Sequence, residues 1–211
     1  MSLRSQRVMS ARKMVEQYVA GKGVDCPRVL KAMEEVPREL FVPEILRERA
    51  YSDHPLPIGY DQTISQPYVV AKMTSALELK GDETILEIGT GSGYQAAILS
   101  KLCKRVFSVE RIPELARKAR SRLEAYGIHN VSVKIDHGLW GWKEFAPFDH
   151  IMITASVSSN IEPIFSQLKD GGRLVAPFER RKKQSLFLIE KCGENIKETR
   201  ICDCSFVPFI S

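Results

Sequence analysis

Apolar positions follow two different periods along the chain, and the change comes near residue 84. Before that point they recur every three or four residues, which predicts amphipathic helices at 11–19, 27–36, 43–50 and 68–79. After it, short apolar runs alternate with helical stretches. Strands are predicted at 84–88, 105–110, 131–135, 149–154 and 173–176, with helices at 94–103, 113–126 and 161–168.

The chain then ends in two strand-like segments, 185–191 and 201–207, with no helix between them. Strands that alternate with helices form parallel sheets, whereas two successive strands pair as antiparallel neighbours. We therefore expect an α/β fold with an open, mostly parallel sheet, helices on both faces and one antiparallel element. Residues 1–80 would add an N-terminal helical cap with a long loop to a core at 81–211, together one compact domain.

Single residues predict where some of these elements begin and end. Asp25 is placed to cap a helix that has Pro27 in its first turn, and Gly127 is placed to end the helix at 113–126. The Asp-Gly-Gly at 170–172 predicts a turn before the next strand. Ligands bind at the carboxyl ends of the strands in such sheets, so the strand ends at 89, 110, 136–137 and 154 should line one crevice.

The stretch 51–67 separates the predicted helices from the predicted sheet. Its prolines and glycine disfavour a regular element through most of its length, yet it carries apolar residues and closely spaced hydroxyls. Long structured loops beside a core sheet usually carry function. We therefore predict a long structured loop that carries function, with Pro67 in the first turn of the helix that follows.

Three glycines at alternate positions, Gly89, Gly91 and Gly93, join the predicted strand at 84–88 to the next helix. Glycine lets a ligand approach the backbone because no Cβ is in the way, and a helix N-terminus presents free N–H groups beside it. This arrangement predicts a nucleotide-type cofactor site. A generic glycine turn of an α/β domain is the alternative.

The spacing of acids and glycines indicates which cofactor binds. A dinucleotide site needs G-x-G-x-x-G, but these glycines read G-x-G-x-G, and Tyr94 occupies the place of the third dinucleotide glycine. Glu87, inside the strand, would repel a pyrophosphate and suits a cationic ligand. Glu110 ends the next strand, where a carboxylate binds ribose hydroxyls. These features favour S-adenosylmethionine, which carries an ammonium and a sulfonium, over NAD or FAD.

Charge and composition limit the partners. The net charge of +5 is spread along 211 residues, which argues little for nucleic acid. The densest basic run, 180–183, lies between two strand-like segments. We interpret it as a solvated hairpin tip, with a basic patch for a partner as the second interpretation. No apolar run reaches membrane length, so we expect no membrane partner.

The five cysteines have no regular spacing that would suit a disulfide framework. Cys202 and Cys204 could suggest a metal, but no second pair or nearby histidine completes a zinc set. Alternate positions on one strand explain them more simply, and we expect no metal. With no signal peptide in the sequence, these observations predict a cytoplasmic protein.

Several blocks of the sequence resemble those of the protein-L-isoaspartate O-methyltransferase family, over about residues 14–208. The most specific block is Gln-Thr-Ile-Ser-Gln-Pro at 62–67, preceded by Leu-Pro-Ile-Gly at 56–59. The glycine block at 86–96 is shared with many other methyltransferases. Further matching blocks lie at 36–43, 146–149, 171–175 and 206–208.

The resemblance implies an enzyme that repairs aged proteins. It would methylate the free α-carboxylate of an L-isoaspartyl residue with S-adenosylmethionine, release S-adenosylhomocysteine, and have a Rossmann-like methyltransferase fold. The ester then cyclises to a succinimide, which hydrolyses in part to aspartate. The partners would be isoaspartyl-containing proteins and peptides, and we expect a monomer.

The resemblance also assigns roles by position. Ser65 is the expected active-site hydroxyl, and Thr63 is its neighbour at the substrate carboxylate. The expected substrate contacts are Thr63, Ile64, Ser65, Thr154 and Ala155. The expected donor site consists of Glu87, Gly89, Thr90, Gly91, Ser92, Gly93, Glu110, Arg111, Asp136, His137 and Gly138.

One position departs from the family pattern. After the third strand the family usually reads Gly-Asp-Gly, with the Asp on the adenine amino group, whereas here the residues are Asp136, His137 and Gly138. Either Asp136 serves adenine from a shifted position, or a His137 ring nitrogen or a backbone group replaces the acid, or His137 only fills space. A lost hydrogen bond would weaken donor binding by about 1 kcal/mol.

The expected chemistry needs no general base, because a carboxylate with a pKa near ~3.5–4 is already ionised at neutral pH. His54, His129 and His150 are therefore interpreted as structural or surface residues. The alternatives are a methyltransferase acting on another carboxylate, a small molecule or nucleic acid, and a non-enzymatic binding module. Enzymes that methylate amino groups of bases need an Asn/Asp-Pro-Pro-aromatic turn after the fourth strand. This chain has Thr-Ala-Ser-Val at 154–157, which cannot supply that turn.

Overall fold

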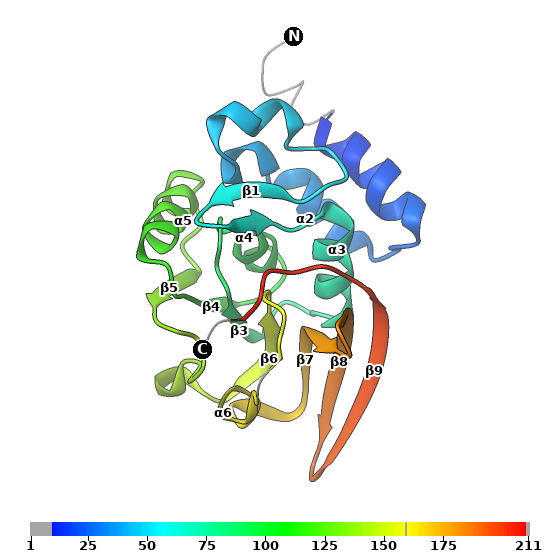
Figure 1. The fold of residues 1–211 in the computed structure, drawn as a ribbon, viewed down its shortest axis with the longest axis vertical. Coiled ribbons are helices and arrows are strands. Elements are labelled where there is room, and N and C mark those ends of the chain that lie inside the picture. Colours follow the sequence, from blue (N-terminus) through cyan, green and yellow to red (C-terminus); the bar gives the residue numbers. More distant parts are fainter. Residues whose placement is uncertain (1–9, 159, 210–211) are drawn as a thin grey trace.

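A seven-stranded sheet lies at the centre of the computed structural model, which describes residues 10–158 and 160–209 (Figure 1). The strand order is β5-β4-β3-β6-β7-β8-β9, and within these strands β8 alone runs against the others. The expected α/β fold with a mostly parallel sheet is confirmed. The strands are β3 Thr84–Ile88, β4 Arg105–Glu110, β5 Val131–Ile135, β6 Phe148–Ile153, β7 Leu168–Arg180, β8 Lys183–Cys192 and β9 Asn195–Asp203.

Helices and short helical segments surround this sheet. The α-helices are α2 Pro27–Glu35, α3 Pro67–Ala76, α4 Tyr94–Ser100, α5 Pro113–Ala125 and α6 Glu162–Phe165. Shorter or tighter helical segments, labelled η, are η1 Val15–Val19, η2 Ala20–Lys22, η3 Arg38–Phe41, η4 Glu44–Arg49 and η5 Lys143–Phe145. Among the described helices, none has the length and apolar composition that a bilayer crossing requires.

Alternate strand residues pack on opposite faces of the sheet. Ile85 and Val106 belong to a buried cluster with residues of α3 and α4. Their neighbours Leu86 and Phe107 belong to another cluster, which includes α6 and the segment around Trp142. Because successive strand side chains point to opposite faces, these two clusters place helical segments on both faces, as the sequence predicted.

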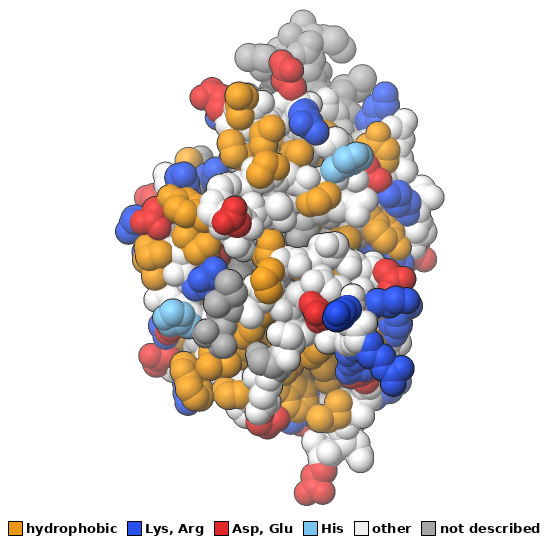
Figure 2. Space-filling view, in the orientation of Figure 1, with side chains coloured by type: hydrophobic (Ala, Val, Ile, Leu, Met, Phe, Trp, Pro, Cys, Tyr) orange, Lys and Arg blue, Asp and Glu red, His pale blue; other side chains and the backbone are white. Residues whose placement is uncertain are grey.

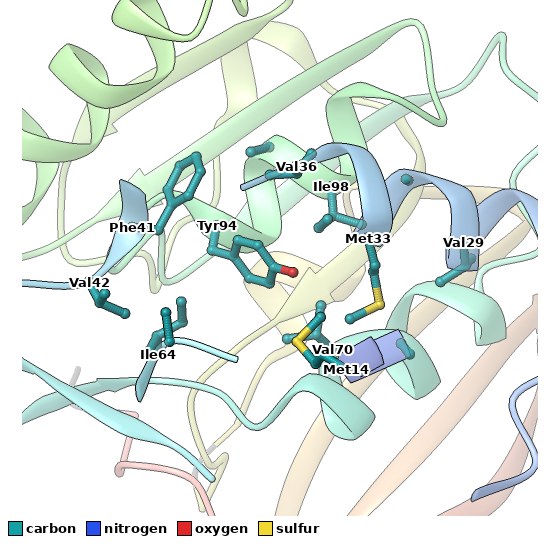
Figure 3. Close-up of a cluster of buried hydrophobic side chains, with 14 of the residues drawn as sticks. Met14, Val29, Met33, Val36, Phe41, Val42, Ile64, Val70, Tyr94 and Ile98 are labelled. Carbon is teal, nitrogen blue, oxygen red and sulfur yellow. The ribbon is translucent and has the colours of Figure 1, made fainter. Parts of the chain in front are cut away.

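The N-terminal helices pack on α4 and α5 through a shared apolar cluster (Figure 3). Met14 and Met33 reach this cluster from separate helices. Tyr94, the first residue of α4, is fully buried in it, and its ring contacts Phe41 edge-on with the ring centroids 5.6 Å apart. Figure 1 shows these helices above the sheet. This packing brings residues from before and after residue 80 to one place.

The stretch 51–67 contains a short regular element that the prediction of a structured loop did not include. Leu56–Gly59 (β1) and Gln62–Ile64 (β2) pair as an antiparallel hairpin. Pro57 is tolerated because each strand of a two-stranded ribbon is an edge strand. Side chains alternate between the two faces of this ribbon, which buries Leu56, Ile58 and Ile64 in the N-terminal cluster. These long-range contacts stabilise strands that local propensity did not indicate.

The strands near the C-terminus also correct the sequence prediction. β7 continues through 170–172, where a turn was predicted, and its pairing with β6 shifts register there. β9 covers 195–203 instead of 201–207. Both errors have one cause: hydrogen bonds to neighbouring strands, which a single-sequence pattern does not contain, decide the boundaries. The basic run 180–183 lies at the tip between β7 and β8, as expected for a hairpin.

Helix boundaries needed smaller corrections. Cys26, without a side-chain cap bond, is the N-cap residue of α2, so the capping role predicted for Asp25 is wrong. α4 ends at Ser100 and α6 is little more than one turn, both shorter than predicted. Gly127 follows α5 with a φ of +76°, the left-handed conformation expected of a helix-ending glycine.

Candidate active site

A cavity of about 840 Å³, including its open mouth, lies where the strand ends meet the β1–β2 hairpin and the C-terminal segment. The strand ends at Gly89, Glu110, Asp136 and Thr154 all line it, as the sequence predicted. Every residue expected to bind donor or substrate lines this cavity except Glu87 and Gly93. The hydroxyl block, which is the Gln-Thr-Ile-Ser-Gln-Pro stretch at 62–67, and the strand ends therefore share one site.

The first glycine of the motif leaves bare backbone at the cavity wall. Gly89 has a φ of +99°, and a Cβ built there would lie 2.3 Å from the Thr154 Oγ1. The Gly89 N–H donates to the Val109 carbonyl at 2.8 Å, and the Thr154 hydroxyl donates to the Gly89 carbonyl at 2.6 Å. Thr154 thus uses its proton to hold the glycine turn, and only its lone pairs face a ligand.

Glu110 is a buried carboxylate that fixes the glycine turn and borders the cavity. Its Oε2 accepts the Gly91 N–H at 2.8 Å, and its Oε1 accepts the Ile112 N–H at 2.9 Å. Each carboxylate oxygen has a second lone-pair direction. Glu110 can therefore accept hydrogen bonds from ligand hydroxyls while it holds the backbone in place.

Glu87 lies behind the cavity and is fully buried. The Ser108 hydroxyl donates to its Oε2, and the Thr90 and Ser108 hydroxyls share a further hydrogen bond. Its Oε1 has no hydrogen-bond partner within the described part of the chain. Burial raises the pKa of Glu87 to about 8, more than the Ser108 bond lowers it. Ionised Glu87 would therefore be stabilised by a cation bound nearby.

Gly93 supports the site from the other side of the motif. A Cβ built on Gly93 would lie 3.2 Å from the Ala119 Cβ of α5, so this glycine permits α5 to pack closely. Arg122 of the same helix donates to the Ser92 carbonyl at 3.2 Å. Both contacts fix the turn without reaching the cavity.

The two hydroxyl residues of the block lie in strand β2 and directly after it. Ile64 is buried in the N-terminal cluster, whereas Thr63 is exposed and Ser65 is half-buried at the cavity (Figure 3). Neither hydroxyl has a hydrogen-bond partner among the described residues. Ser65 directly follows the last residue of β2, and both hydroxyls line the cavity, where they remain available to a ligand.

Arg38 anchors this block and was not assigned a role from the sequence. Its side chain is fully buried; Nε donates to the Ala50 carbonyl at 2.8 Å, and Nη2 donates to the Ser65 carbonyl at 2.7 Å. The guanidinium lies over the Tyr94 ring, 4.8 Å from its centroid. Burial raises the pKa of Tyr94 to about 12, so the phenol stays neutral beneath it. The one signal in the sequence is that Arg38 falls in the matching block 36–43.

Asp136 and His137 both line the cavity, at the end of β5. The Asp136 carboxylate forms an ion pair with Lys134 at 2.8 Å and accepts the His137 N–H at 2.7 Å. The Lys134 contact lowers the pKa of Asp136. Gly138 follows with a φ of +75°, and a Cβ there would lie 2.8 Å from the Ile88 Cγ2. The glycine therefore keeps this turn close to β3.

Other lining residues were missed by sequence reasoning. Gln62 of β2, two residues of α3 and two of α4 line the cavity, and the C-terminal segment forms a further wall; these residues are Val70, Met73, Tyr94, Gln95, Val207, Pro208 and Phe209. The matching block 206–208 was a signal for that wall. Of the histidines set aside as structural, His150 accepts the Arg173 N–H at the opposite end of the sheet.

The charges around the cavity suit a cationic ligand. Glu110 and Asp136 line it, against one guanidinium among the described lining residues, that of Arg111. No lysine is among the lining residues that the structure describes. A pyrophosphate would meet excess negative charge here, whereas an ammonium and a sulfonium would be attracted. The bare turn at Gly89 and the acid at Glu110 thus fit S-adenosylmethionine.

Among the described residues, no group of His, Cys, Asp or Glu is arranged to hold a metal ion. The five cysteines are free thiols, and burial raises the pKa of Cys204 to about 12.

Comparisons with known proteins identify the family of this chain. The sequence model of the family described as "Protein-L-isoaspartate(D-aspartate) O-methyltransferase (PCMT)" matches residues 9–211. Protein-L-isoaspartate O-methyltransferase 1 of Syntrophobacter fumaroxidans is 51% identical over 94% of this chain and 92% of its own. The protein-L-isoaspartate O-methyltransferase of Syntrophus aciditrophicus is 50% identical, with the same coverage.

Solved structures show the same fold. A protein-L-isoaspartate O-methyltransferase structure superposes with a TM-score of 0.84 at 30% identity, covering 93% of this chain and 65% of that one. A putative Plasmodium falciparum enzyme in complex with S-adenosyl-L-homocysteine superposes with a TM-score of 0.83 at 24% identity, over 95% and 98% of the two chains. With the family match over nearly its whole length, this chain belongs to the protein-L-isoaspartate(D-aspartate) O-methyltransferase family.

Proposed function

We propose that this protein methylates the free α-carboxylate of L-isoaspartyl residues in damaged proteins and peptides, with S-adenosylmethionine as donor. The observation that carries the proposal is that the Thr63 and Ser65 hydroxyls, without other partners in the described structure, line the same cavity as the glycine turn. The methyl ester would cyclise to a succinimide and return in part to aspartate.

The substrate carboxylate would be its own nucleophile. A carboxylate with a pKa near ~4 is ionised at neutral pH, so no side chain has to remove a proton. The O–H groups of Ser65 and Thr63 would hold it as hydrogen-bond donors without cancelling its charge. A cation in the same place would bind more tightly and make the oxygen less nucleophilic.

The donor's place follows from the residues that can hold it. When bound, S-adenosylmethionine supplies a methyl group activated by its sulfonium. Glu110 would accept bonds from the ribose hydroxyls, the bare backbone at Gly89 would allow close approach, and Glu87 would offset the positive charge from behind. The hairpin would exclude water above this turn, since the Ile58 side chain lies 3.5 Å from a Cβ built on Gly91.

At the adenine end, we infer that His137 or a backbone group replaces the usual acid. The Asp136 carboxylate accepts from Lys134 and from the His137 N–H, which fixes its orientation. Each of its oxygens keeps a second lone pair, so adenine recognition by Asp136 from a shifted position is the alternative. The side chain of His137 is exposed at the cavity and has room to turn toward a base.

The test uses two peptides that differ only in having an isoaspartyl or an aspartyl residue at one position. We expect methyl transfer from labelled donor to the isoaspartyl peptide alone. Ser65→Ala should lower kcat by about tenfold or more while the affinity for S-adenosylhomocysteine changes by less than about twofold. Equal labelling of both peptides, or of neither, would contradict the proposal and favour another carboxylate or a small molecule as substrate.

Three further expectations belong to this proposal: the protein is a monomer, lies in the cytoplasm, and has no nucleic-acid partner. Light scattering of the purified protein would check the first. Added RNA or DNA should leave methyl transfer unchanged.

A further inference from the structure

The basic tip between β7 and β8 lies at the same edge of the sheet as the cavity. β7 runs parallel to β6, and β6 runs parallel to β3, so their carboxyl ends point the same way. In Figure 1 the upper end of β8 lies beside the C-terminal segment that crosses above the sheet. The solvated tip that the sequence predicts therefore lies near the cavity. The sequence alone did not indicate this proximity.

Two backbone bridges connect the tip to the cavity wall. Val157 pairs with Phe178 near the end of β7, and the adjacent Ser156 pairs with Pro208, which lines the cavity. Neighbouring strands lie about 4.8 Å apart, so Phe178 is about 10 Å from Pro208. Arg181 is at most about 10 Å further along the chain. An extended peptide of about six residues spans that distance.

The tip carries cations that are not neutralised locally. Arg180 is paired with Glu198 through both guanidinium nitrogens, at 2.7 Å each. Arg181, Lys182 and Lys183 are exposed, and none of them has a salt-bridge partner among the described residues. Figure 2 shows lysine and arginine side chains gathered at the right of this face, over the upper ends of β8 and β9.

The acids around the tip do not cancel this charge. Glu198 forms an ion pair with Arg180, and Asp203 forms one with Arg200. Glu179 is exposed one residue before the tip. The unpaired cations thus outnumber the unpaired acid, and the tip has excess positive charge.

The turn itself does not require these side chains. Arg181 and Lys182 have φ values of 50° and 63°, the left-handed conformation of a two-residue hairpin turn. Such turns favour Asn and Gly, because longer side chains are strained there. Turn chemistry therefore gives no reason for basic residues at these positions.

We propose that the tip at 181–183 is a docking surface for acidic side chains of the substrate chain, about three to six residues from the residue in the cavity. This inference rests on the proposed function. The partner is an extended, acidic peptide segment, because the tip is narrow and lies one short peptide length from the cavity wall. Exposed pairs are individually weak, so the contact tunes affinity and leaves the chemistry unchanged.

The experiment uses the full chain and three isoaspartyl peptides that are identical except for a flank of three residues. The flank is Glu, Gln or Lys, placed three to six residues from the isoaspartyl residue, on either side in separate sets. At low salt we expect kcat/KM to fall in the order Glu, Gln, Lys for at least one side, with about three- to tenfold between Glu and Lys. The difference should lie in KM and should shrink by at least half at 0.3 M salt.

Two double variants test the tip itself. Arg181→Asn with Lys182→Gly removes two of the three unpaired cations, which leaves Lys183 against Glu179, and gives the turn its preferred residues, so folding is retained. The three peptides should become nearly equal. Arg181→Glu with Lys182→Glu should reverse the order. The matched control is Lys80→Glu with Lys104→Glu, which makes the same change in net charge at exposed positions before β3 and β4. It should leave the order intact.

Some outcomes would overturn the proposal. Equal kcat/KM for all three peptides at low salt, or an order unchanged by both tip variants, would show that the tip is only solvated. In that case methylation of the Gln peptide would leave the proposed function standing. Failure to methylate any isoaspartyl peptide would instead contradict the proposed function, and the docking surface with it.

Discussion

The buried guanidinium of Arg38 donates to the backbone carbonyl of Ser65 at 2.7 Å. The same side chain donates to the Ala50 carbonyl and lies over the ring of Tyr94, which lines the cavity. Arg38 therefore ties η3 to the hydroxyl block and to the first residue of α4. A fully buried cation held by carbonyls and an aromatic face costs desolvation, and here it fixes the position of the residue expected to hold the substrate.

Arg38→Lys should impair turnover more than stability alone explains. Lysine keeps the charge but has no planar fork to reach both carbonyls, so the Ser65 backbone should shift. We expect kcat to fall about ten- to a hundredfold, with donor affinity changed by less than about twofold. Methyl-transfer kinetics and calorimetry with S-adenosylhomocysteine measure the two effects.

Arg28→Lys is the matched control for that variant. Arg28 also donates to two backbone carbonyls, those of Leu79 and Leu102, but lies away from the cavity. It should lose about 1–2 kcal/mol of stability and retain kcat. If both variants lowered kcat equally, the role of Arg38 would be general stability and not the positioning of Ser65.

Glu110→Gln should weaken donor binding. The amide keeps one acceptor oxygen and brings an NH₂ group against either the Gly91 N–H or the Ile112 N–H. Losing charge-assisted hydrogen bonds costs about 1.5–3 kcal/mol, so the Kd for S-adenosylhomocysteine should rise about ten- to a hundredfold. Glu114→Gln, at an exposed ion pair with Arg117, serves as control and should leave that Kd unchanged.

Alanine substitution at two glycines with nearly the same φ distinguishes the effect of steric crowding on stability from the effect of backbone strain. Gly138 and Gly171 have φ values of +75° and +74°, but a Cβ at Gly171 meets no atom within 4 Å, whereas at Gly138 it lies 2.8 Å from Ile88. Gly171→Ala should cost about 1–2 kcal/mol from strain. Gly138→Ala should cost about 1–3 kcal/mol more and also reduce donor affinity. Equal losses in urea unfolding would mean that the Gly138 turn moves aside freely.

The buried Glu87 should make stability depend on pH. Its pKa is raised to about 8, from about 4.3 in an unfolded chain, so the folded protein retains a proton that the unfolded chain releases. Its contribution is therefore most favourable below about pH 4.3 and declines as pH rises toward 8, by up to about 1.4 kcal/mol per pH unit. Glu87→Gln removes this decline. Urea unfolding at pH 6, 7 and 8 should show that the free energy of unfolding of the variant rises relative to that of the parent protein as the pH increases. A constant difference between the two would show that Glu87 is ionised throughout this range.

Asp136→Asn and His137→Ala should separate the two explanations of the adenine end. If the His137 ring serves adenine, His137→Ala raises the donor Kd by about fivefold, the value of one hydrogen bond, while Asp136→Asn has a smaller effect. If a backbone group serves adenine, both variants leave the donor Kd nearly unchanged. Lys134→Gln, which removes the ion pair with Asp136, controls for loss of order in the turn. A larger effect from Asp136→Asn would assign adenine to that acid.

Much of the fold could be predicted because the signals were local. Short apolar runs at 84–88, 105–110 and 131–135 predicted strand bounds that the structure matches residue for residue. The glycine turn was predicted for the same reason, since glycine spacing and the flanking elements lie within a dozen residues. The β1–β2 hairpin was not predicted and the ends of β7 and β9 were predicted wrongly, because strand pairing and burial against distant segments stabilise them.

By itself, the sequence determined the order of elements, the glycine turn with its acids, and the hydroxyl block, because period, backbone freedom and charge are properties of neighbouring residues. Tertiary structure alone decided what those residues face. It buried Glu87 so that its pKa rises, placed Arg38 against Ser65, brought the C-terminal segment to the cavity wall and put a basic tip beside it. Each of these depends on contacts between residues far apart in sequence and on the removal of water, which a linear pattern does not specify.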